Sequence, residues 1–328
     1  MFTRIFKSNL ALQFFILFLA AFILWVEAFL PQTPQTVYPK IISIIHFSPD
    51  WFSGMVWFSK LLALMLVLFE AIYLNLIISE NGILPRSTFF VAFIYLILMS
   101  HSGNLLTFHP VLLSNLFLIL SVRDFFKAFN KDDASTEIYS SVFWVGIASL
   151  FNLSAIFFLV FIWFSYITYR LLSWREWAIS LFGIITPYLF LIVYNFWFDK
   201  PLLPDDYLYF FRHFRQIVFH PDTILIIFYV LLGLIFLISF PRAMSEVRDK
   251  VISIRKRFTI LFNFLFAGIV SLIFSGENFD IQLCILFIPL SVYIAIFLTS
   301  VKKPLIPEIL FIGLILSVLI ERYLSFTF

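Results

Sequence analysis

Hydrophobic and polar positions follow one another in long blocks along this chain of 328 residues. A membrane core about 30 Å thick is crossed by a helix of roughly 20 apolar residues, and several of the apolar blocks reach that length. Short polar breaks separate them. The pattern predicts eleven hydrophobic segments, at about residues 10–30, 57–79, 86–100, 107–123, 138–151, 153–170, 177–197, 222–240, 258–275, 281–299 and 305–322.

The amino-acid composition, taken together with this pattern, identifies the fold class. The chain is 62% hydrophobic and only 12% charged, whereas soluble domains carry about 25% charged residues. Within lipid, backbone polar groups must be paired inside a helix or a closed barrel, and the alternating ten-residue segments of a barrel are missing. The sequence therefore predicts an all-α, polytopic transmembrane helix bundle that forms a single integral membrane domain over residues 1–328.

The distribution of lysine and arginine predicts the orientation. If the N-terminus is cytoplasmic and each segment crosses once, sixteen of the twenty-two Lys and Arg residues fall on the inner side. Inner loops are enriched in these residues, so we expect an N-in, C-out protein of the bacterial inner (cytoplasmic) membrane. The first segment has a basic flank, but its apolar run is too long for a signal peptide and no cleavage pattern follows. We expect an uncleaved first span.

Four consecutive segments are short for a bilayer of about 30 Å. They form two adjacent pairs, 86–100 with 107–123 and 138–151 with 153–170. Each pair is either two tilted spans or a re-entrant hairpin, and both alternatives return the chain to the same side. The alternatives differ in depth, because a hairpin places the polar breaks "HSGN" and "FNLS" inside the membrane.

Three connections have features of their own. Residues 31–56 form a long outer loop, and residues 204–220 form an amphipathic helix when plotted at 100° per residue, which favours the outer membrane interface. Residues 241–257 form a basic inner connector. This connector either rests on anionic lipid headgroups or serves only to fix the topology.

All five histidines fall on the predicted outer half, together with several carboxylates. The sequence has no HxxxH or HExxH spacing and a single cysteine, Cys284, so no metal site is indicated. Glycines form no GxGxxG, P-loop or GxxxG pattern, which argues against a loop that cradles a nucleotide and against glycine-mediated helix dimerisation. The cluster predicts a polar outer site for a phosphate-bearing group, or else a surface that docks a partner. Its substrate-binding candidates are His101, His109, Arg212, His213, Arg215 and His220.

Two glutamates stand out by position. Glu27 ends the first segment, where partial desolvation suits a carboxylate for proton transfer. Glu70 lies in the middle of "LLALMLVLFEAIYLNLIIS". A carboxylate at this depth costs at least ~3 kcal/mol and must face a partner or water. Glu70 is therefore either functional or a neutral hydrogen-bonding group between helices.

A family resemblance begins at His109 and extends to Asp199. It is carried by a helix headed by "HP", by "VFWVGIASLFNLSAIFFLVF" and by "GIITPYLFLIVYNFWFD". This order resembles the central part of the C-type membrane glycosyltransferases, which use polyprenyl-phosphate-linked sugars. The resemblance implies a catalytic carboxylate near the long first outer loop, a role for Glu27 or Asp50. Asp50 is isolated there, whereas such enzymes have a close acidic pair in outer loops. As a whole, the chain resembles a family of polytopic bacterial inner-membrane proteins that implies no particular activity.

Three functions follow as hypotheses. The first is a glycosyltransferase-like protein that acts on a lipid-linked substrate in envelope biogenesis, without a cofactor. The second is a non-catalytic membrane subunit of an envelope export or assembly complex, whose partners are other inner-membrane proteins. The third is a transporter that uses Glu70. All three expect membrane lipids as partners and none expects nucleic acid.

Overall fold

The computed structural model describes residues 10–29, 56–85, 88–131, 133–171, 173–200, 223–274, 279–300 and 305–327. These residues contain eleven α-helices, three short 3-10 helices and no strand. The helices of the N-terminal half are α2 (Leu10–Trp25), α3 (Val56–Glu80), α4 (Phe90–Met99), α5 (Pro110–Lys127) and α6 (Ser135–Phe151). Those of the C-terminal half are α7 (Phe158–Tyr169), α8 (Trp174–Trp197), α10 (Thr223–Arg248), α11 (Ile252–Phe274), α12 (Phe279–Ser300) and α13 (Leu305–Thr327). The 3-10 helices are η1 (Val26–Phe29), η3 (Gly103–Leu106) and η4 (Leu153–Phe157).

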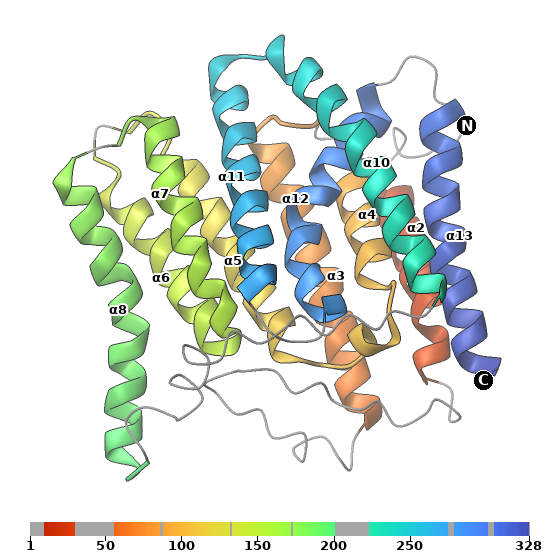
Figure 1. Ribbon diagram of the computed structural model, residues 1–328, viewed down its shortest axis with the longest axis horizontal. Coiled ribbons are helices and arrows are strands. Elements are labelled where there is room, and N and C mark those ends of the chain that lie inside the picture. The colour runs from red at the N-terminus through yellow and green to blue at the C-terminus, as the bar shows by residue number, and fades with distance from the viewer. Residues whose placement is uncertain are drawn as a thin grey trace.

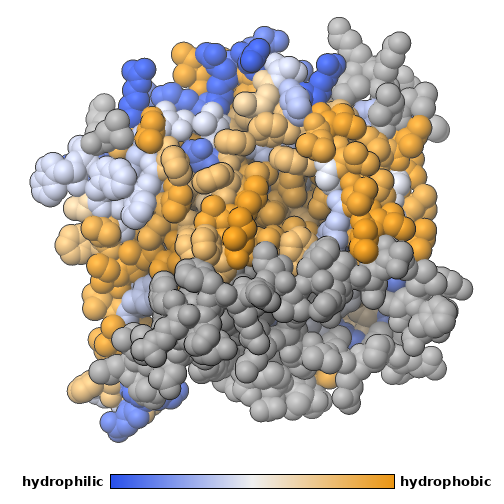
Figure 2. Space-filling model, in the orientation of Figure 1, coloured by the Kyte–Doolittle hydropathy of each residue, from blue (hydrophilic) through white to orange (hydrophobic). Residues whose placement is uncertain are grey.

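The predicted all-α membrane bundle is confirmed. Each of the eleven apolar segments coincides with one α-helix, and the helices pack side by side in one bundle (Figure 1). Six of them are long and apolar enough to cross a membrane, starting with Leu12–Phe29 and Val56–Glu80 and ending with Phe279–Ser300. Hydrophobic side chains cover the middle of the face in view, and hydrophilic groups gather along the edge where α10 joins α11 (Figure 2). The chain is a multi-pass membrane protein.

The basic connections meet at one end of the bundle, which we call the basic end. The Arg257 guanidinium donates a hydrogen bond to the Asn81 carbonyl oxygen after α3, over 3.0 Å. Arg175 at the start of α8 forms a 3.2 Å ion pair with Asp133, which precedes α6. Hydrogen bonds from Ser135 lower the pKa of the Asp133 carboxyl below its ordinary value. Successive helices therefore alternate in direction, as the charge bias predicts.

Helix α12 occupies the centre of the bundle. All of its apolar window is buried, and it contacts α4, α5, α10, α11 and α13. A helix that is hydrophobic on every side is buried on every side, and the sequence "CILFIPLSVYIAIFL" has this character. Cys284 is fully buried on this helix.

Helices α6 and α8 approach each other closely through two glycines. A Cβ at Gly146 of α6 would lie 2.9 Å from Pro187 Cγ, and one at Gly183 of α8 would lie 3.0 Å from Val142 Cβ. The lack of a GxxxG pattern argued against glycine-mediated helix dimerisation, but single glycines still bring two helices of this chain together. The search for GxxxG misses the contact because each helix supplies only one glycine to it.

Gly183→Ala tests this contact. The new methyl group would lie 3.0 Å from Val142 Cβ and 3.2 Å from the Tyr139 carbonyl oxygen, so α8 must shift at a cost of about 1–3 kcal/mol. We expect a lower melting temperature of the purified protein, followed by tryptophan fluorescence in detergent.

The matched control is Gly313→Ala on α13, where an added Cβ meets no atom within 4 Å. We expect this variant to be neutral or to gain up to about 1 kcal/mol, because alanine favours a helix over glycine. Equal melting temperatures for the two variants would contradict the close approach of α6 and α8.

Candidate functional site

The polar break after α4 lies within the thickness of the membrane. Helix α4 has 10 residues, which at 1.5 Å per residue makes it about 15 Å long, half of a membrane core about 30 Å thick. Because α4 starts at the basic end, it stops near mid-depth. Helix α3 and helix α8 both extend well beyond the turn that joins α6 to α7 (Figure 1). The polar residues of the segment 100–109 are buried within the bundle, among them Ser100, His101 and His109.

The carbonyl groups at the end of α4 are satisfied by the residues that follow. The Ser100 hydroxyl donates to the Leu96 carbonyl oxygen over 2.7 Å, and the Ser100 amide donates to Ile97 over 3.1 Å. His101 Nδ1 lies 2.8 Å from the Leu98 carbonyl oxygen. A carbonyl can only accept, so Nδ1 carries the proton in this contact. The first role of His101 is thus to cap a helix that ends inside the membrane.

The His101 ring is held by aromatic side chains from α10 and α12. It stacks on Phe228 with ring centroids 4.6 Å apart, and the rings of Tyr229 and Phe287 meet it edge-on at 5.9 and 5.2 Å. Only 1% of His101 is exposed. The Tyr229 hydroxyl donates to Asp280 Oδ1 at the start of α12. His101, Tyr229 and Asp280 therefore form one site, which we call the His101 site.

His109 is also buried, at the N-cap of α5. Neither of its ring nitrogens has a hydrogen-bond partner among the described residues. The preceding amide, that of Phe108, donates to Ser59 Oγ of α3 over 3.1 Å. A buried imidazole without a partner is costly, so its nitrogens remain available to a ligand or to water.

A third polar group joins the α6–η4 turn to α12. Asn152 Nδ2 donates to Gln282 Oε1 over 3.0 Å, and Gln282 Nε2 donates back to Asn152 Oδ1 over 3.2 Å. Ser154 Oγ donates to Asn152 Oδ1 over 2.9 Å, and Ser271 Oγ of α11 donates to Ser154 Oγ over 3.0 Å. These groups are buried and mutually paired. The break "FNLS" thus fixes the hairpin to its neighbours, a role that sequence reasoning did not assign to Gln282.

Glu70 faces protein inside the bundle. It is fully buried, and the Tyr95 hydroxyl of α4 donates to Glu70 Oε2 over 2.8 Å. The second carboxylate oxygen, Oε1, has no hydrogen-bond partner among the described residues. Asn115 of α5 is fully buried beside the Tyr95 side chain.

The remaining sequence candidates divide into two groups. Glu27 lies on η1 and is half-buried, and the Lys60 ammonium donates to the neighbouring Ala28 carbonyl oxygen, which ties η1 to α3. The other candidates lie outside the described residues, namely Asp50, Arg212, His213, Arg215 and His220.

An apolar groove of about 270 Å³ adjoins the His101 site between α10, α11 and α12. Tyr229 belongs to both. A Cβ added at Gly233 of α10 would meet no atom within 4 Å, so the groove has free space at this point. The lining residues are Tyr229, Leu232, Gly233, Phe236, Leu265, Ile269, Phe279, Leu283, Leu286 and Leu290.

Comparison with known protein families, curated proteins and solved structures identifies no relative of this chain. The chain matches no protein-family model, no curated protein and no solved structure. The function must therefore be argued from the site itself.

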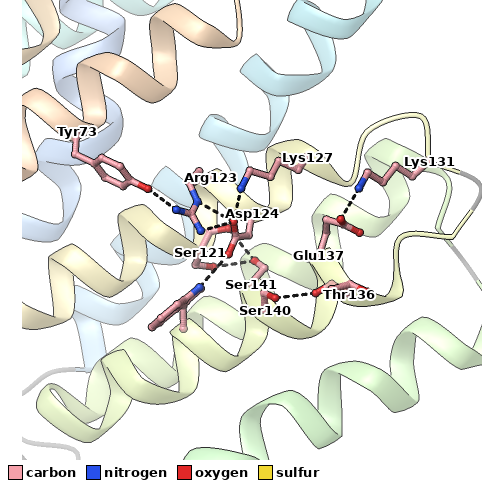
Figure 3. A network of polar contacts seen from close by, with 11 residues as sticks. Tyr73, Ser121, Arg123, Asp124, Lys127, Lys131, Thr136, Glu137, Ser140 and Ser141 are labelled. Atoms are coloured by element: carbon pink, nitrogen blue, oxygen red, sulfur yellow. Dashed lines mark hydrogen bonds and ion pairs between the residues drawn. The ribbon is translucent and has the colours of Figure 1, made fainter.

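A polar network that sequence reasoning missed lies near the basic end (Figure 3). Asp124 of α5 accepts hydrogen bonds from Arg123 Nε over 2.8 Å, Lys127 Nζ over 3.1 Å and Trp144 Nε1 of α6 over 3.0 Å. Arg123 also donates to the Tyr73 hydroxyl of α3. The carboxylate is thus surrounded by donors from its own helix and from α6, and the network holds three helices together.

Gln282→Leu tests whether the Asn152 group is structural. The single variant leaves the Asn152 side chain without its α12 partner, which costs about 1–3 kcal/mol for a buried polar group. We expect a lower melting temperature.

The double variant Asn152→Leu with Gln282→Leu removes both partners, and replacing both by apolar groups is far less costly. Ser154 loses its Asn152 acceptor in this variant, so we expect the melting temperature to fall by less than the sum of the losses in the single variants Asn152→Leu and Gln282→Leu. A double variant that loses the sum of the two single losses would show that the pair is not a unit.

Proposed function

We propose that this protein is a glycosyltransferase-like enzyme of the bacterial inner membrane that acts on a lipid-linked substrate in envelope biogenesis. The observation that carries the proposal is the position of Tyr229. It lines the apolar groove, contacts the His101 ring and hydrogen-bonds Asp280. A long hydrocarbon chain in the groove would place its polar head beside the His101 site.

The surroundings of the groove suit a lipid chain. Its lining is hydrophobic apart from the Tyr229 hydroxyl. Neighbouring side chains on the same helices are exposed and apolar, among them Val230, Leu234 and Phe266, as expected for a surface that faces lipid. A chain could therefore enter sideways from the membrane.

The polar end of the groove suits a phosphate-bearing head. The capping bond of His101 leaves Nε2 as the ring nitrogen that does not bind Leu98. The break 100–109 is irregular backbone inside the membrane, a feature that occurs where protein buries it or where it lines a cavity. Discontinuous helices of this kind form the binding sites of many membrane transport proteins.

In the proposed reaction a carboxylate removes the proton from an acceptor hydroxyl. The new bond between that oxygen and the sugar forms as the bond between the sugar and the lipid phosphate breaks, and the phosphate leaves on the lipid. The candidate bases are Glu27, on the η1 segment that Lys60 ties to α3, and Asp50 in the first outer loop. A positioned base contributes roughly 10²- to 10⁴-fold to such a step.

A second candidate function is a proton-coupled transporter, and a specific observation favours it. Glu70 is fully buried, and one of its carboxylate oxygens has no partner among the described residues. Ionisable residues are rare inside transmembrane segments, and those that occur there commonly mark ion pathways or proton relays. In Glu70→Gln the amide oxygen can still accept the hydrogen bond from the Tyr95 hydroxyl, but the side chain can no longer bind and release a proton.

The groove is tested with Gly233→Trp. An added Cβ at Gly233 meets no atom within 4 Å, so we expect the fold to persist while the indole displaces a lipid chain. We expect the amount of co-purified polyprenyl lipid, measured by mass spectrometry after mild detergent extraction, to fall about tenfold, the equivalent of ~1.4 kcal/mol.

Gly313→Trp on α13 is the matched control, since a Cβ there also meets no atom within 4 Å. It should retain the lipid. If both variants keep the lipid, or if the unmodified protein carries none, the groove does not bind the substrate. Stoichiometric protein partners in place of lipid would favour a subunit of an envelope assembly complex.

Catalysis is tested by Glu27→Gln and Asp50→Asn in proteoliposomes. We expect at least one of them to slow sugar transfer from a polyprenyl-phosphate donor by about 10²- to 10⁴-fold. Glu246→Gln is the control, because Glu246 is exposed on α10 near the basic end. Unchanged transfer in both acidic-site variants would refute the enzymatic proposal.

The same proteoliposomes distinguish the enzyme from the proton-coupled transporter. Glu70→Gln should leave sugar transfer unchanged, because the glutamine still accepts the Tyr95 hydrogen bond. If instead this variant abolishes proton-dependent uptake into the vesicles, the transporter is the better assignment.

A further inference from the structure

A second cavity lies at the basic end, on the opposite side of the bundle from the His101 site. It has a volume of about 660 Å³ and is formed by the turn after α5, the last residue of α7 and the first turns of α11. We call it the α11 cleft. Its lining residues are Phe129, Asn130, Tyr169, Val251, Ile252, Ser253, Arg255 and Lys256.

The charged side chains of the α11 cleft are cationic. Arg255 and Lys256 form no ion pair among the described residues, and no carboxylate lines the cleft. The Lys256 ammonium lies 5.4 Å from the centre of the Phe129 ring, and the Arg257 guanidinium lies 5.8 Å from the same centre. The closest acidic residue in sequence is Asp249, which is exposed. The cleft therefore favours an anion.

The backbone adds positive potential. Helix α11 is 23 residues long and begins at Ile252, in the lining of the cleft. The amides of Ile254 and Arg255 both donate to the Val251 carbonyl oxygen, at 3.0 and 3.2 Å. Amides in the first turn of a helix have no partner within that helix, so those of Ile252 and Ser253 can donate to a ligand. Phosphate groups bind such helix N-termini through the amides and the helix dipole.

Tyr169 provides an independent observation that points to a ligand. This cleft-lining residue is only 8% exposed, and the Arg257 guanidinium lies beside its hydroxyl. A guanidinium can only donate a hydrogen bond, so the hydroxyl proton has no acceptor among the described residues. Phe125 and Phe129 pack on its ring, with centroids 5.3 Å away in both cases, so the side chain cannot easily turn outward. Beside it, Asn130 has a left-handed φ of 58°, which ends the α5 turn at the edge of the cleft.

The apolar part of the lining suggests where the anion comes from. Val251 is 65% exposed and Ile252 is 60% exposed, although both lie next to cationic residues at the end of a membrane bundle. Exposed aliphatic side chains beside Lys and Arg are typical of a surface that contacts lipid headgroups and the upper part of their chains.

We propose that the α11 cleft is a specific binding site for the phosphate group of an anionic membrane phospholipid. Arg255, Lys256 and the first amides of α11 bind the phosphate, the Tyr169 hydroxyl donates to it, and Val251 with Ile252 contacts the acyl region. A volume of about 660 Å³ leaves room for the glycerol that carries the phosphate. The site does not depend on the proposed sugar transfer.

The test uses the full-length protein in nanodiscs of phosphatidylcholine titrated with phosphatidylglycerol, with binding followed by native mass spectrometry. The variant Arg255→Gln with Lys256→Gln should bind phosphatidylglycerol at least about tenfold more weakly, since two charge-assisted bonds are lost. The matched control, Arg242→Gln with Arg248→Gln, removes the same charge from the end of α10, outside the cleft lining, and should bind nearly as tightly as the unmodified protein.

A smaller change keeps the proposal testable if the double variant does not fold. Tyr169→Phe removes a hydroxyl whose proton has no acceptor among the described residues and whose one described neighbour is the Arg257 guanidinium, which keeps its bond to the Asn81 carbonyl oxygen. It should keep the melting temperature in phosphatidylcholine yet lower phosphatidylglycerol affinity several-fold, in line with one hydrogen bond to a charged group.

Three results would overturn the proposal. If both double variants lose binding equally, the attraction is a diffuse charge effect of the basic connector and not a site. If Tyr169→Phe binds as tightly as the unmodified protein, the hydroxyl does not contact the lipid. If inorganic phosphate or glycerol phosphate displaces the lipid at equal concentration, the ligand is a soluble phosphate.

Discussion

The architecture depends on how one helix end is satisfied inside the membrane. Helix α4 stops after 10 residues, where no bulk water can pair its last carbonyl groups, and each unpaired group would cost several kcal/mol. Ser100 and His101 provide the donors, and Trp25 Nε1 of α2 donates to Ser100 Oγ over 3.0 Å. These hydrogen bonds allow α4 to end within the bundle, so that the non-helical residues after it can form a polar site.

The buried polar groups fall into two kinds, and their pairing distinguishes them. Asn152, Gln282 and Ser154 hydrogen-bond one another, which is what a structural connection between helices requires. His109 and Glu70, by contrast, keep polar atoms without partners among the described residues. A protein that spans a membrane has little reason to bury such atoms unless a ligand, water or a proton uses them.

The two ends of the bundle present different chemistry to the lipid. Near the His101 site, an apolar groove reaches a tyrosine that is bound to a carboxylate. At the basic end, cations and free helix amides surround a cleft whose edge is aliphatic. We propose an amphiphilic ligand for both features, and they differ in charge, because cationic side chains line only the second.

The sequence by itself determined the membrane class, the eleven helices and their alternating direction, because segment length and the placement of Lys and Arg are local properties that the bilayer selects directly. It also singled out His101 and Glu70, since polar residues inside apolar runs are conspicuous.

The tertiary structure decided what these residues contact. The pairing of Glu70 with Tyr95, the aromatic enclosure of His101, the link between Asn152 and Gln282 and the α6–α8 glycine contact each join residues that are far apart along the chain. Such contacts depend on which helix faces lie together, and uniformly apolar helices such as α12 carry no periodic signal that would reveal their facing.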